Sequence, residues 1–320
     1  MNNTILLIGA GNLGSRYLQG LKAVNSKIII YVYDIFEESL IKAKNYYDII
    51  PKNIFSKEIF FINKLDKLPN SFDIIIISTT ANVRLKIIED LLISNIKFKN
   101  LILEKVLAQN FNNIDKILFL LRNHSNVWIN TPRRMMNWYN SIKSNLKSNI
   151  PIKMSIRGGD WGLACNSIHF IDLINYFTGE HITNVSTTKL NNKWEPSKRV
   201  NFFEVFGELN IYFSNGSHLI LESNQNLINT YIIKFQQLNI EWEIDEKLGV
   251  AKNSNGLLIN GELTLQSKLT PILVEKLIKS NSCELTDLHT SAKLHTPLIE
   301  SLLSHWNISM NKKDNILPIT

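Results

Sequence analysis

The chain has 320 residues, of which 44% are hydrophobic, 20% charged and 9% aromatic. This is the composition of a globular protein with enough apolar material for a large core, and it excludes a disordered tail, a collagen-like fibre and a small disulfide scaffold. The formal net charge is +7, but the lysines are scattered and no run of five basic residues occurs. We therefore expect no nucleic-acid binding, which needs clustered charge, and the balance instead favours anionic small molecules.

Cysteine content and hydropathy indicate the compartment. The two cysteines, Cys165 and Cys283, are too few and too far apart for a disulfide framework or a zinc knuckle, and we assign no metal site. No stretch reaches the ~18 consecutive apolar residues that a membrane-spanning helix needs. The N-terminus enters a hydrophobic strand without a charged leader region. We expect a reduced, cytoplasmic protein that has no membrane partner.

The first 130 residues alternate short apolar runs with helical patterns, which is typical of a parallel sheet built from βαβ units. The predicted strands are 4–8, 27–33, 59–62, 71–78, 101–104 and 127–130. Helices are predicted from the glycine-rich turn to about residue 24, and at 37–47, 83–94 and 114–122. The run of isoleucines at 74–77 is expected for a strand that is buried on both faces.

From about residue 131 the pattern changes to mixed helices and strands. Helices are predicted at 138–147, at 167–177 with Gly179 as C-cap, and at 271–280 and 290–306. Strands and turns fill 182–265, with segments 202–213, 218–222, 231–235, 240–244 and 256–265. Asn215-Gly216 is a strong hairpin signal.

These patterns together predict an α/β protein of two domains. Residues 1–130 would form a Rossmann domain with a doubly wound parallel sheet. Residues 131–320 would form an α+β domain with an open, mostly antiparallel sheet, for substrate binding and oligomerisation. The helix at 290–306 is predicted to pack back on the Rossmann domain.

The first strand is followed by Gly9-Ala10-Gly11-Asn12-Leu13-Gly14, a complete G-x-G-x-x-G motif that opens a helix. In this context Gly9 permits the tight turn, Gly11 lets the backbone approach a pyrophosphate, and Gly14 lets the helix pack closely on the strand. The phosphates would rest on the helix N-terminus, at Asn12 and Leu13. The motif predicts dinucleotide binding; the alternative is an ordinary βα turn.

Asp34 lies twenty residues after Gly14, at the end of the second predicted strand. A carboxylate there binds the ribose hydroxyls of NAD and repels the 2′-phosphate of NADP, and no Arg or Lys follows it directly. We expect NAD, with NADP disfavoured; the alternative is that Asp34 is a helix cap. Ligands bind at the carboxyl ends of parallel strands, so Ser78, Thr79 and Glu104 are also assigned to the cofactor site.

Two further motifs carry acid/base groups. Glu104 and Lys105 end the fifth predicted strand, which directs Lys105 toward the nicotinamide crevice. Later, Gly158-Gly159 precedes a helix on which His169 and Asp172 are three residues apart and share a face. The alternatives are a solvated lysine at a strand end and a histidine satisfied in the core.

Together these motifs resemble the Gfo/Idh/MocA oxidoreductase family, and the segment 130–134 resembles that family's entry into its second domain. The resemblance covers most of the chain and is most specific between residues 4 and 179. It implies an enzyme that oxidises a sugar or polyol hydroxyl, or reduces the ketone, with NAD(P). It also implies that Lys105 exchanges a proton with the reacting oxygen and that His169 assists proton exchange or orients the substrate.

The chain departs from the family pattern at two positions. The proline that follows the family lysine is Val106 here, and the aspartate four residues before the histidine is Cys165. Asn166 beside it forms hydrogen bonds but accepts no proton at neutral pH. These departures favour altered chemistry, a different substrate or loss of catalysis.

Several residues near the predicted domain junction suit substrate binding. Arg133, Arg134 or Arg157 could hold a phosphate or carboxylate with two hydrogen bonds, and surface or interdomain ion pairs are the alternative. Trp161 could stack on a sugar or on nicotinamide, or belong to the core. We assign Arg134, Trp161 and Asn166 to the substrate site, with Lys105 and His169.

The sequence therefore predicts an NAD-dependent oxidoreductase that acts on a sugar-like, anionic substrate, such as a nucleotide-sugar or acidic sugar of surface-polysaccharide biosynthesis. A homodimer or homotetramer is expected. One alternative is a non-catalytic NAD(H)-binding regulator or sensor of the same fold. Another is an enzyme that uses NAD transiently, in epimerisation or elimination.

Overall fold

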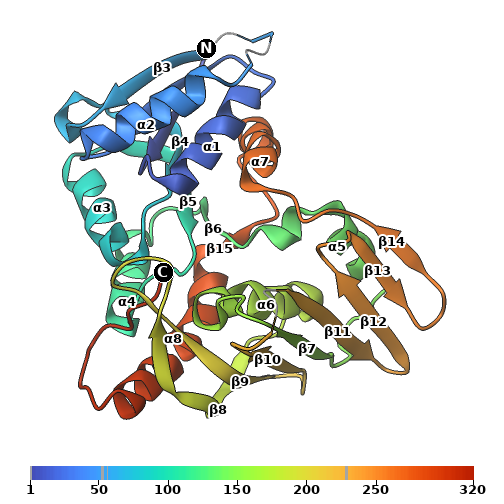
Figure 1. The fold of residues 1–320 in the computed structure, drawn as a ribbon. Coiled ribbons are helices and arrows are strands. Elements are labelled where there is room, and N and C mark those ends of the chain that lie inside the picture. Colours follow the sequence, from blue (N-terminus) through green and yellow to red (C-terminus); the bar gives the residue numbers. More distant parts are fainter. Residues whose placement is uncertain (1, 52–53, 56, 228–229) are drawn as a thin grey trace. The chain divides into compact units, whose positions relative to one another are not determined.

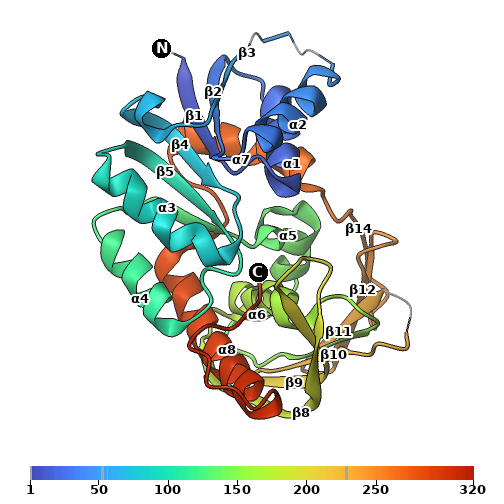
Figure 2. The same cartoon turned by 60° about the vertical axis from the view of Figure 1, so that its left-hand side comes forward.

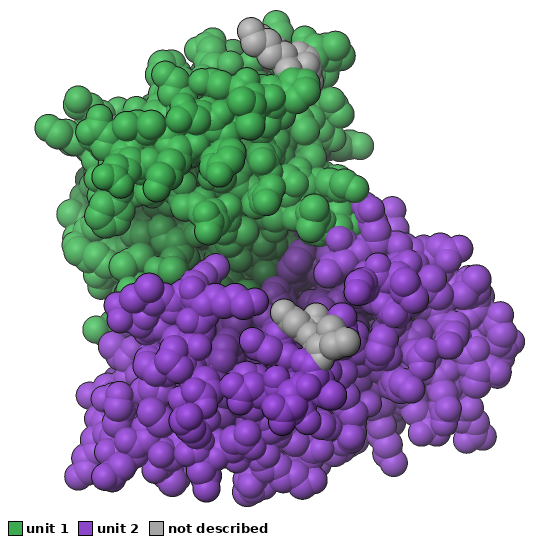
Figure 3. Space-filling view, in the orientation of Figure 1, with its two compact units in different colours: residues 1–105, 116–130, 264–288 green, residues 106–115, 131–263, 289–320 purple. Residues whose placement is uncertain are grey.

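The computed structural model describes residues 2–51, 54–55, 57–227 and 230–320, and the chain divides into two compact units (Figure 3). Unit 1 comprises residues 1–105, 116–130 and 264–288. Unit 2 comprises residues 106–115, 131–263 and 289–320.

Unit 1 is built on a seven-stranded sheet with the order β15-β6-β5-β4-β1-β2-β3. Its strands are β1 (Asn3–Ile8), β2 (Ile28–Tyr33), β3 (Lys57–Ile62), β4 (Ser71–Ile77), β5 (Lys97–Glu104), β6 (Val127–Asn130) and β15 (Thr286–Asp287). Strands β1 to β6 pair in parallel, and β15 pairs antiparallel with β6. The isoleucines at 74–77 are fully buried, as expected for a central parallel strand.

The helices of unit 1 lie on the two faces of this sheet. They are α1 (Asn12–Ala23), α2 (Glu37–Asp48), α3 (Ala81–Ile93) and α7 (Gln266–Ser280), with a short 3-10 turn, η1 (Leu65–Lys67). Helix α4 (Phe111–Leu120) contributes its second half to this unit. Figure 2 shows α1 and α2 on one side of the sheet and α3 on the other. The prediction of a doubly wound parallel sheet is confirmed, with each predicted strand and helix present.

The boundary of unit 1 differs from the predicted single division after residue 130. Helix α7 packs along α1, where Gly20 makes room: a Cβ added at Gly20 would lie 2.4 Å from Cβ of Thr270. The backbone N–H of Asn25 also donates to Oε1 of Glu275 at 2.8 Å. Residues 264–288 therefore return to the first unit, and residues 289–320 group with the second.

Unit 2 contains an eight-stranded sheet with the order β14-β13-β12-β11-β7-β10-β9-β8 (Figure 1). Its strands are β7 (Lys153–Gly158), β8 (Ile182–Pro196), β9 (Phe203–Phe213), β10 (His218–Ser223), β11 (Tyr231–Gln237), β12 (Ile240–Asp245), β13 (Val250–Asn253) and β14 (Leu258–Asn260). Its helical segments are η2 (Pro132–Met135), α5 (Asn137–Ser144), α6 (Leu163–Thr178) and α8 (Leu288–Ser309), the last of which starts at the unit boundary. All neighbouring strands are antiparallel except β7 and β10, which confirms the mostly antiparallel sheet.

The predicted strand at 256–265 is wrong in extent, because β14 covers only Leu258–Asn260. Gly256 has a positive φ of 84°, as a turn residue, and the chain leaves the sheet at Gly261. There the backbone lies against an indole, and a Cβ at Gly261 would come within 2.3 Å of Trp138 Cγ. The strands β7 and β13 were not identified from their sequences. β13 is only four residues long, whereas the polar–apolar alternation of Lys153–Gly158 was a usable signal for β7.

The described residues contain no helix that is both long and apolar enough to cross a membrane. They also contain no group of three His, Cys, Asp or Glu side chains arranged to hold a metal ion.

Replacing Gly14 by alanine is expected to lower the free energy of unfolding by about 1–3 kcal/mol, because overpacking a tight contact forces the backbone to shift. A Cβ at Gly14 would lie 1.9 Å from the carbonyl oxygen of Gly9. The matched control is Gly11→Ala, whose Cβ would meet nothing within 4 Å. Urea unfolding of both variants checks this, and equal stabilities would contradict it.

Candidate functional site

The glycine loop that joins β1 to α1 is fixed by the ends of two neighbouring strands. Gly9 has a positive φ of 94°, and its N–H donates to the carbonyl oxygen of Tyr33 at 2.9 Å. The Ser78 hydroxyl donates to the carbonyl oxygens of Ile8 at 3.0 Å and Gly9 at 2.8 Å. A Cβ at Gly9 would lie 2.8 Å from Cγ2 of Thr79, so this loop and the residues after β4 are in close contact.

The N-terminus of α1 presents uncapped backbone amides beside an open space. Gly11 is the N-cap, and no side chain makes a capping hydrogen bond there. The first N–H groups of a helix have no partner within the helix, so those of Asn12 and Leu13 can bind an anion. Gly11 itself is exposed, and a Cβ on it would meet no atom within 4 Å. This combination of free amides and clearance suits a pyrophosphate.

Asp34 joins the glycine loop to the end of β2. Its carboxylate accepts the N–H of Ala10 at 2.7 Å and the N–H of Phe36 at 2.9 Å, one on each oxygen. An ionised carboxylate has about four acceptor positions, so each oxygen keeps capacity for a further donor such as a ribose hydroxyl. The structure therefore brings Asp34 and the predicted glycines together.

Glu104 is only 5% exposed and is occupied by other side chains of unit 1. Its Oε1 accepts the Tyr17 hydroxyl at 2.5 Å and Nδ2 of Asn130 at 2.7 Å. Burial, followed by the Glu104 charge, raises the pKa of Tyr17 well above its ordinary value. This arrangement makes Glu104 a buried anchor at the end of β5, and Lys105, the next residue, is partly exposed.

In unit 2 the segment between β7 and α6 is held by side-chain hydrogen bonds. The Trp161 indole N–H donates to the carbonyl oxygen of Glu222 at 2.9 Å, and its ring packs edge-on against Phe170 and Tyr231. Asn166 Nδ2 donates to the backbone oxygen of Trp161 at 2.7 Å. The indole is thus buried in the core, which is the alternative that the sequence left open for it.

Helix α6 carries His169 and begins four residues earlier than predicted. Gly162 is its N-cap, and the Glu204 carboxylate from β9 accepts the N–H of Ala164 at 2.7 Å and that of Cys165 at 3.3 Å. A carboxylate at a helix N-terminus is stabilised by the first N–H groups and the helix dipole. A strand distant in sequence therefore supplies the cap that defines the start of the helix.

Arg134 is held by the carboxylate that follows His169 by three residues. Its Nε and Nη2 donate to the two oxygens of Asp172 at 2.7 and 2.8 Å, and Nη2 also donates to Oδ1 of Asn175 at 2.7 Å. This bidentate pair ties η2 to α6 and leaves little of the Arg134 side chain exposed. The two-hydrogen-bond contact that was predicted between Arg134 and a ligand is thus made with Asp172 of the protein itself.

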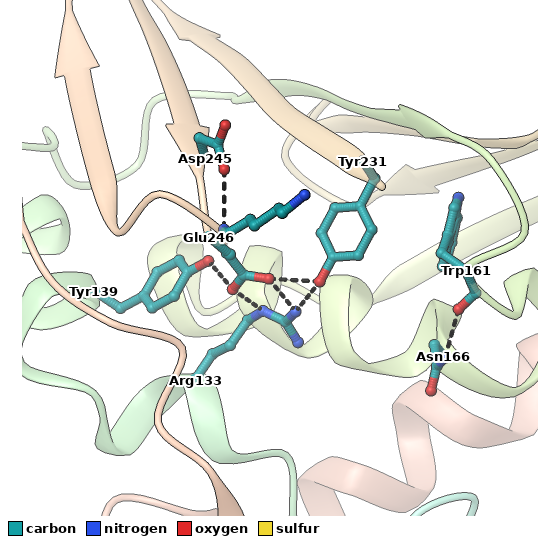
Figure 4. Close-up of polar contacts among 8 residues, drawn as sticks. Arg133, Tyr139, Trp161, Asn166, Tyr231, Asp245 and Glu246 are labelled. Atoms are coloured by element: carbon teal, nitrogen blue, oxygen red, sulfur yellow. Dashed lines mark hydrogen bonds and ion pairs between the residues drawn. The ribbon is translucent and has the colours of Figure 1, made fainter. Parts of the chain in front are cut away.

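Its neighbour Arg133 forms a second buried ion pair, shown in Figure 4. Nε and Nη2 donate to the two oxygens of Glu246 at 2.8 and 2.7 Å. The hydroxyls of Tyr139 and Tyr231 donate to the same carboxylate at 2.5 and 2.6 Å. The predicted third arginine, Arg157, is more exposed and pairs with Glu222 at 3.0 Å.

The Glu246 carboxylate is held ionised by its partners. Burial by itself would raise its pKa, but the Arg133 guanidinium and the hydrogen bonds from Arg133 and the two tyrosines outweigh burial, so the pKa of Glu246 lies below its ordinary value. Burial raises the pKa of Tyr231 and Tyr139, and the Glu246 charge adds to this effect. The four side chains act as one buried network.

This network borders a cavity of about 700 Å³ within unit 2. The start of β11, the turn from β12 to β13, and the segment Gly261–Leu263 line it. Its polar lining includes Tyr231, Asp245, Glu246, Lys247 and Glu262. Arg133, Tyr139 and Tyr231 already fill the acceptor positions of Glu246, so its carboxylate has none left for a ligand in this cavity.

Sequence reasoning missed three features of these sites. Ile35 and Phe36 follow Asp34 and are each 65% exposed, which is unusual for large apolar side chains next to a polar site. Two apolar residues directly after the acidic residue that ends β2 were a usable signal for apolar surface beside the site. Glu246 and the buried Arg84 carried no local signal, because their partners are distant in sequence.

Comparison with models of protein families and with curated proteins finds no match to this chain. Solved structures do match along nearly its full length. UDP-N-acetylglucosamine 3-dehydrogenase from Acidithiobacillus ferrooxidans has a TM-score of 0.70 at 12% identity, covering 95% of this chain and 98% of that one. Myo-inositol 2-dehydrogenase from Lactobacillus plantarum has a TM-score of 0.67 at 16% identity, covering 99% and 100%.

A third neighbour is scyllo-inositol dehydrogenase from Lactobacillus casei with bound NAD(H) and scyllo-inositol. It has a TM-score of 0.67 at 15% identity and covers 98% of each chain. At these identities the likeness concerns the fold. It shows that the fold of these dehydrogenases extends over both units of the chain.

Replacing Glu246 by glutamine is expected to lower the free energy of unfolding at pH 7 by about 3–5 kcal/mol, because Arg133 is left as an uncompensated buried charge. Since the folded pKa of Glu246 is depressed, its stabilisation is present above the unfolded value of 4.5 and is lost as pH falls through the folded pKa. The gap between wild type and E246Q should therefore narrow below pH 4.5. Urea unfolding at pH 7 and pH 3.5 measures it, with exposed Glu300→Gln as control; a gap independent of pH would refute the pairing.

Proposed function

We propose that this protein is an NAD(H)-dependent oxidoreductase acting on a hydroxyl or keto carbon of a sugar-like substrate. The observation that carries the proposal is the glycine loop. The N-terminal amides of α1 have no side-chain cap, the space beside Gly11 is open, and the Asp34 carboxylate accepts a hydrogen bond from Ala10 of the same loop. Similarity in fold to sugar and inositol dehydrogenases supports the same reaction class.

The residues of unit 1 fit a dinucleotide at both ends of its adenosine diphosphate portion. The amides of Asn12 and Leu13 would bind the pyrophosphate, and Asp34 would accept hydrogen bonds from the adenosine ribose. Ile35 and Phe36 offer apolar surface beside Asp34 on which an adenine ring would pack. Ser78 and Thr79 would complete the site by holding the glycine loop in place.

NAD is favoured over NADP on charge. The Asp34 carboxylate would repel a 2′-phosphate, and Glu37 and Glu38 in the first turn of α2 add negative charge nearby in sequence. Apolar side chains occupy positions 35 and 36, where a basic residue would be needed to neutralise that phosphate.

Bound NAD(H) would supply the hydride acceptor or donor for the reaction. Lys105 would exchange a proton with the reacting oxygen at its Nζ atom, and His169 would orient the substrate or share the proton. The anchored Glu104 supports this role for Lys105, because a group fixed on a rigid strand end holds a reacting geometry more closely than a loop does.

The substrate would carry several hydroxyl groups, as inositol and the sugar of the nucleotide-sugar neighbour do. An anionic sugar of surface-polysaccharide biosynthesis stays a prediction from the basic charge balance. The cytoplasmic location and the homodimeric or homotetrameric state are likewise predictions, which fractionation and light scattering would test.

A non-catalytic NAD(H)-binding regulator is the second candidate function. Cys165 and Val106 favour it, because they stand where the resembled enzymes have an acidic residue and a proline. In the structure the backbone N–H of Cys165 is bound by Glu204, so a carboxylate is nevertheless present at this end of α6.

The first prediction concerns cofactor binding. NADH should stabilise the purified protein in a thermal-shift titration, and NADPH should not, because Asp34 repels the 2′-phosphate. Gly11→Ala should fold like wild type and yet lose at least tenfold in NADH affinity, because its methyl group occupies the space next to the pyrophosphate. A protein that neither dinucleotide stabilises would refute the cofactor proposal.

The second prediction separates an enzyme from a regulator. Lys105→Ala should retain NADH affinity within about threefold and lose at least 100-fold in turnover, the range that general acid/base groups contribute. Turnover is followed by NADH absorbance and by product analysis with inositols, keto-sugars and nucleotide-sugars. Absence of conversion by wild type across this panel, with NADH binding intact, would favour the regulator; conversion without net NADH change would indicate transient use of the cofactor.

A further inference from the structure

An arginine in unit 1 is fully buried beside the glycine loop, and the roles proposed above leave it unused. Arg84 lies in the first turns of α3 and has 0% exposed surface. Arginine is almost never fully buried unless its charge and donors are satisfied. What its guanidinium contacts therefore indicates what it holds in place.

On one side the guanidinium supports the loop that follows β4. Nη2 of Arg84 donates to the carbonyl oxygen of Thr79 at 2.7 Å. The methyl group of Thr79 lies against Gly9, and the Ser78 hydroxyl donates to the Gly9 carbonyl oxygen. Arg84 thus forms a hydrogen bond to the same segment, residues 78–79, against which the glycine loop packs.

The guanidinium also interacts electrostatically with Glu104 and Tyr17. Burial lowers the pKa of Arg84 to about 10, and the charges of Glu104 and Tyr17 oppose this shift. The group therefore stays protonated near neutral pH. Glu104 is itself bound by Tyr17 of α1 and Asn130 of β6, and it directly precedes Lys105.

We propose that Arg84 is a positioning residue that joins the loop after β4 to the Tyr17–Glu104–Asn130 cluster, and so holds the glycine loop and the Glu104-Lys105 strand end in register. The guanidinium suits this task because it is planar and always charged: one of its donors binds the Thr79 carbonyl oxygen, and its charge acts on Glu104. The benefit to cofactor binding rests on the proposed function, whereas the mechanical link does not.

The test compares Arg84→Met with a matched control, Arg122→Met. Arg122 is also in unit 1 and also donates to a backbone carbonyl, that of Phe119 at 2.6 Å, but it is exposed. Amide hydrogen exchange is measured on the free proteins at a temperature where circular dichroism shows both folded. NADH affinity is then measured by fluorescence titration.

In R84M we expect exchange to rise at least tenfold in residues 9–14 and 78–81, and the NADH Kd to rise at least tenfold. R122M should match wild type within twofold in both. The double variant R84M/E104Q removes the unpaired charge while glutamine still accepts from Tyr17 and Asn130. It should regain thermal stability without regaining protection or affinity, because the Thr79 carbonyl still has no arginine donor.

Two results would overturn the proposal. Unchanged exchange in both segments of R84M would show that Arg84 does not hold the loop. Recovery of protection and affinity in R84M/E104Q would show that Arg84 only neutralises Glu104. If wild type fails to bind NADH, the exchange data still decide this inference while the proposed cofactor role fails.

A conservative variant covers the case in which R84M does not fold. Arg84→Lys keeps a positive charge for Glu104 but replaces the planar guanidinium, which donates to the Thr79 carbonyl oxygen, by a compact ammonium group on a flexible stem. The same increase in exchange, confined to residues 9–14 and 78–81, is expected, and wild-type protection in both segments would again overturn the proposal.

Discussion

The close approach of Gly14 to the carbonyl of Gly9 is the constraint on which the rest of unit 1 depends. It fixes where α1 begins relative to β1, and therefore which residues of that helix face the sheet and its neighbours. Tyr17, one turn later, meets Glu104, and Gly20, a further turn on, leaves the space for α7. A single contact without side chains thus sets both the position of the N-terminal end of α1, where the proposed function places the pyrophosphate, and the packing along its length.

Local patterns predicted most of unit 1. The buried strands, the glycine spacing and Asp34 are each specified by residues close together in sequence, so periodicity and turn chemistry suffice to find them. The return of α7 to the first unit was not predictable in this way. Gly20 inside a helical pattern was its one sign, and nothing in a single sequence says which distant segment fills the space that a glycine leaves.

Unit 2 shows the same limit for charged residues. Arg133 and Arg134 have the chemistry of ligand-binding arginines; the sequence placed Arg134 in the substrate site and left an ion pair open as the alternative for both. In the structure Glu246, 113 positions away, and Asp172, 38 positions away, take both guanidinium groups. Buried ion pairs of this kind contribute little to net stability, because desolvation offsets much of their attraction. Their partners are set by tertiary structure, which local pattern does not encode.

The passage of residues 264–288 through unit 1 has a consequence for synthesis on the ribosome. The chain leaves the first unit at Asn130, builds the second sheet, and only then supplies α7 and β15. At roughly 5–20 residues per second, translation of that intervening stretch takes on the order of ten seconds or more. Throughout that interval the β6 edge of the first sheet lacks its partner strand β15, and the Gly20 face of α1 lacks helix α7. The first unit, although it contains the N-terminus, is therefore completed only after the second sheet has been synthesised.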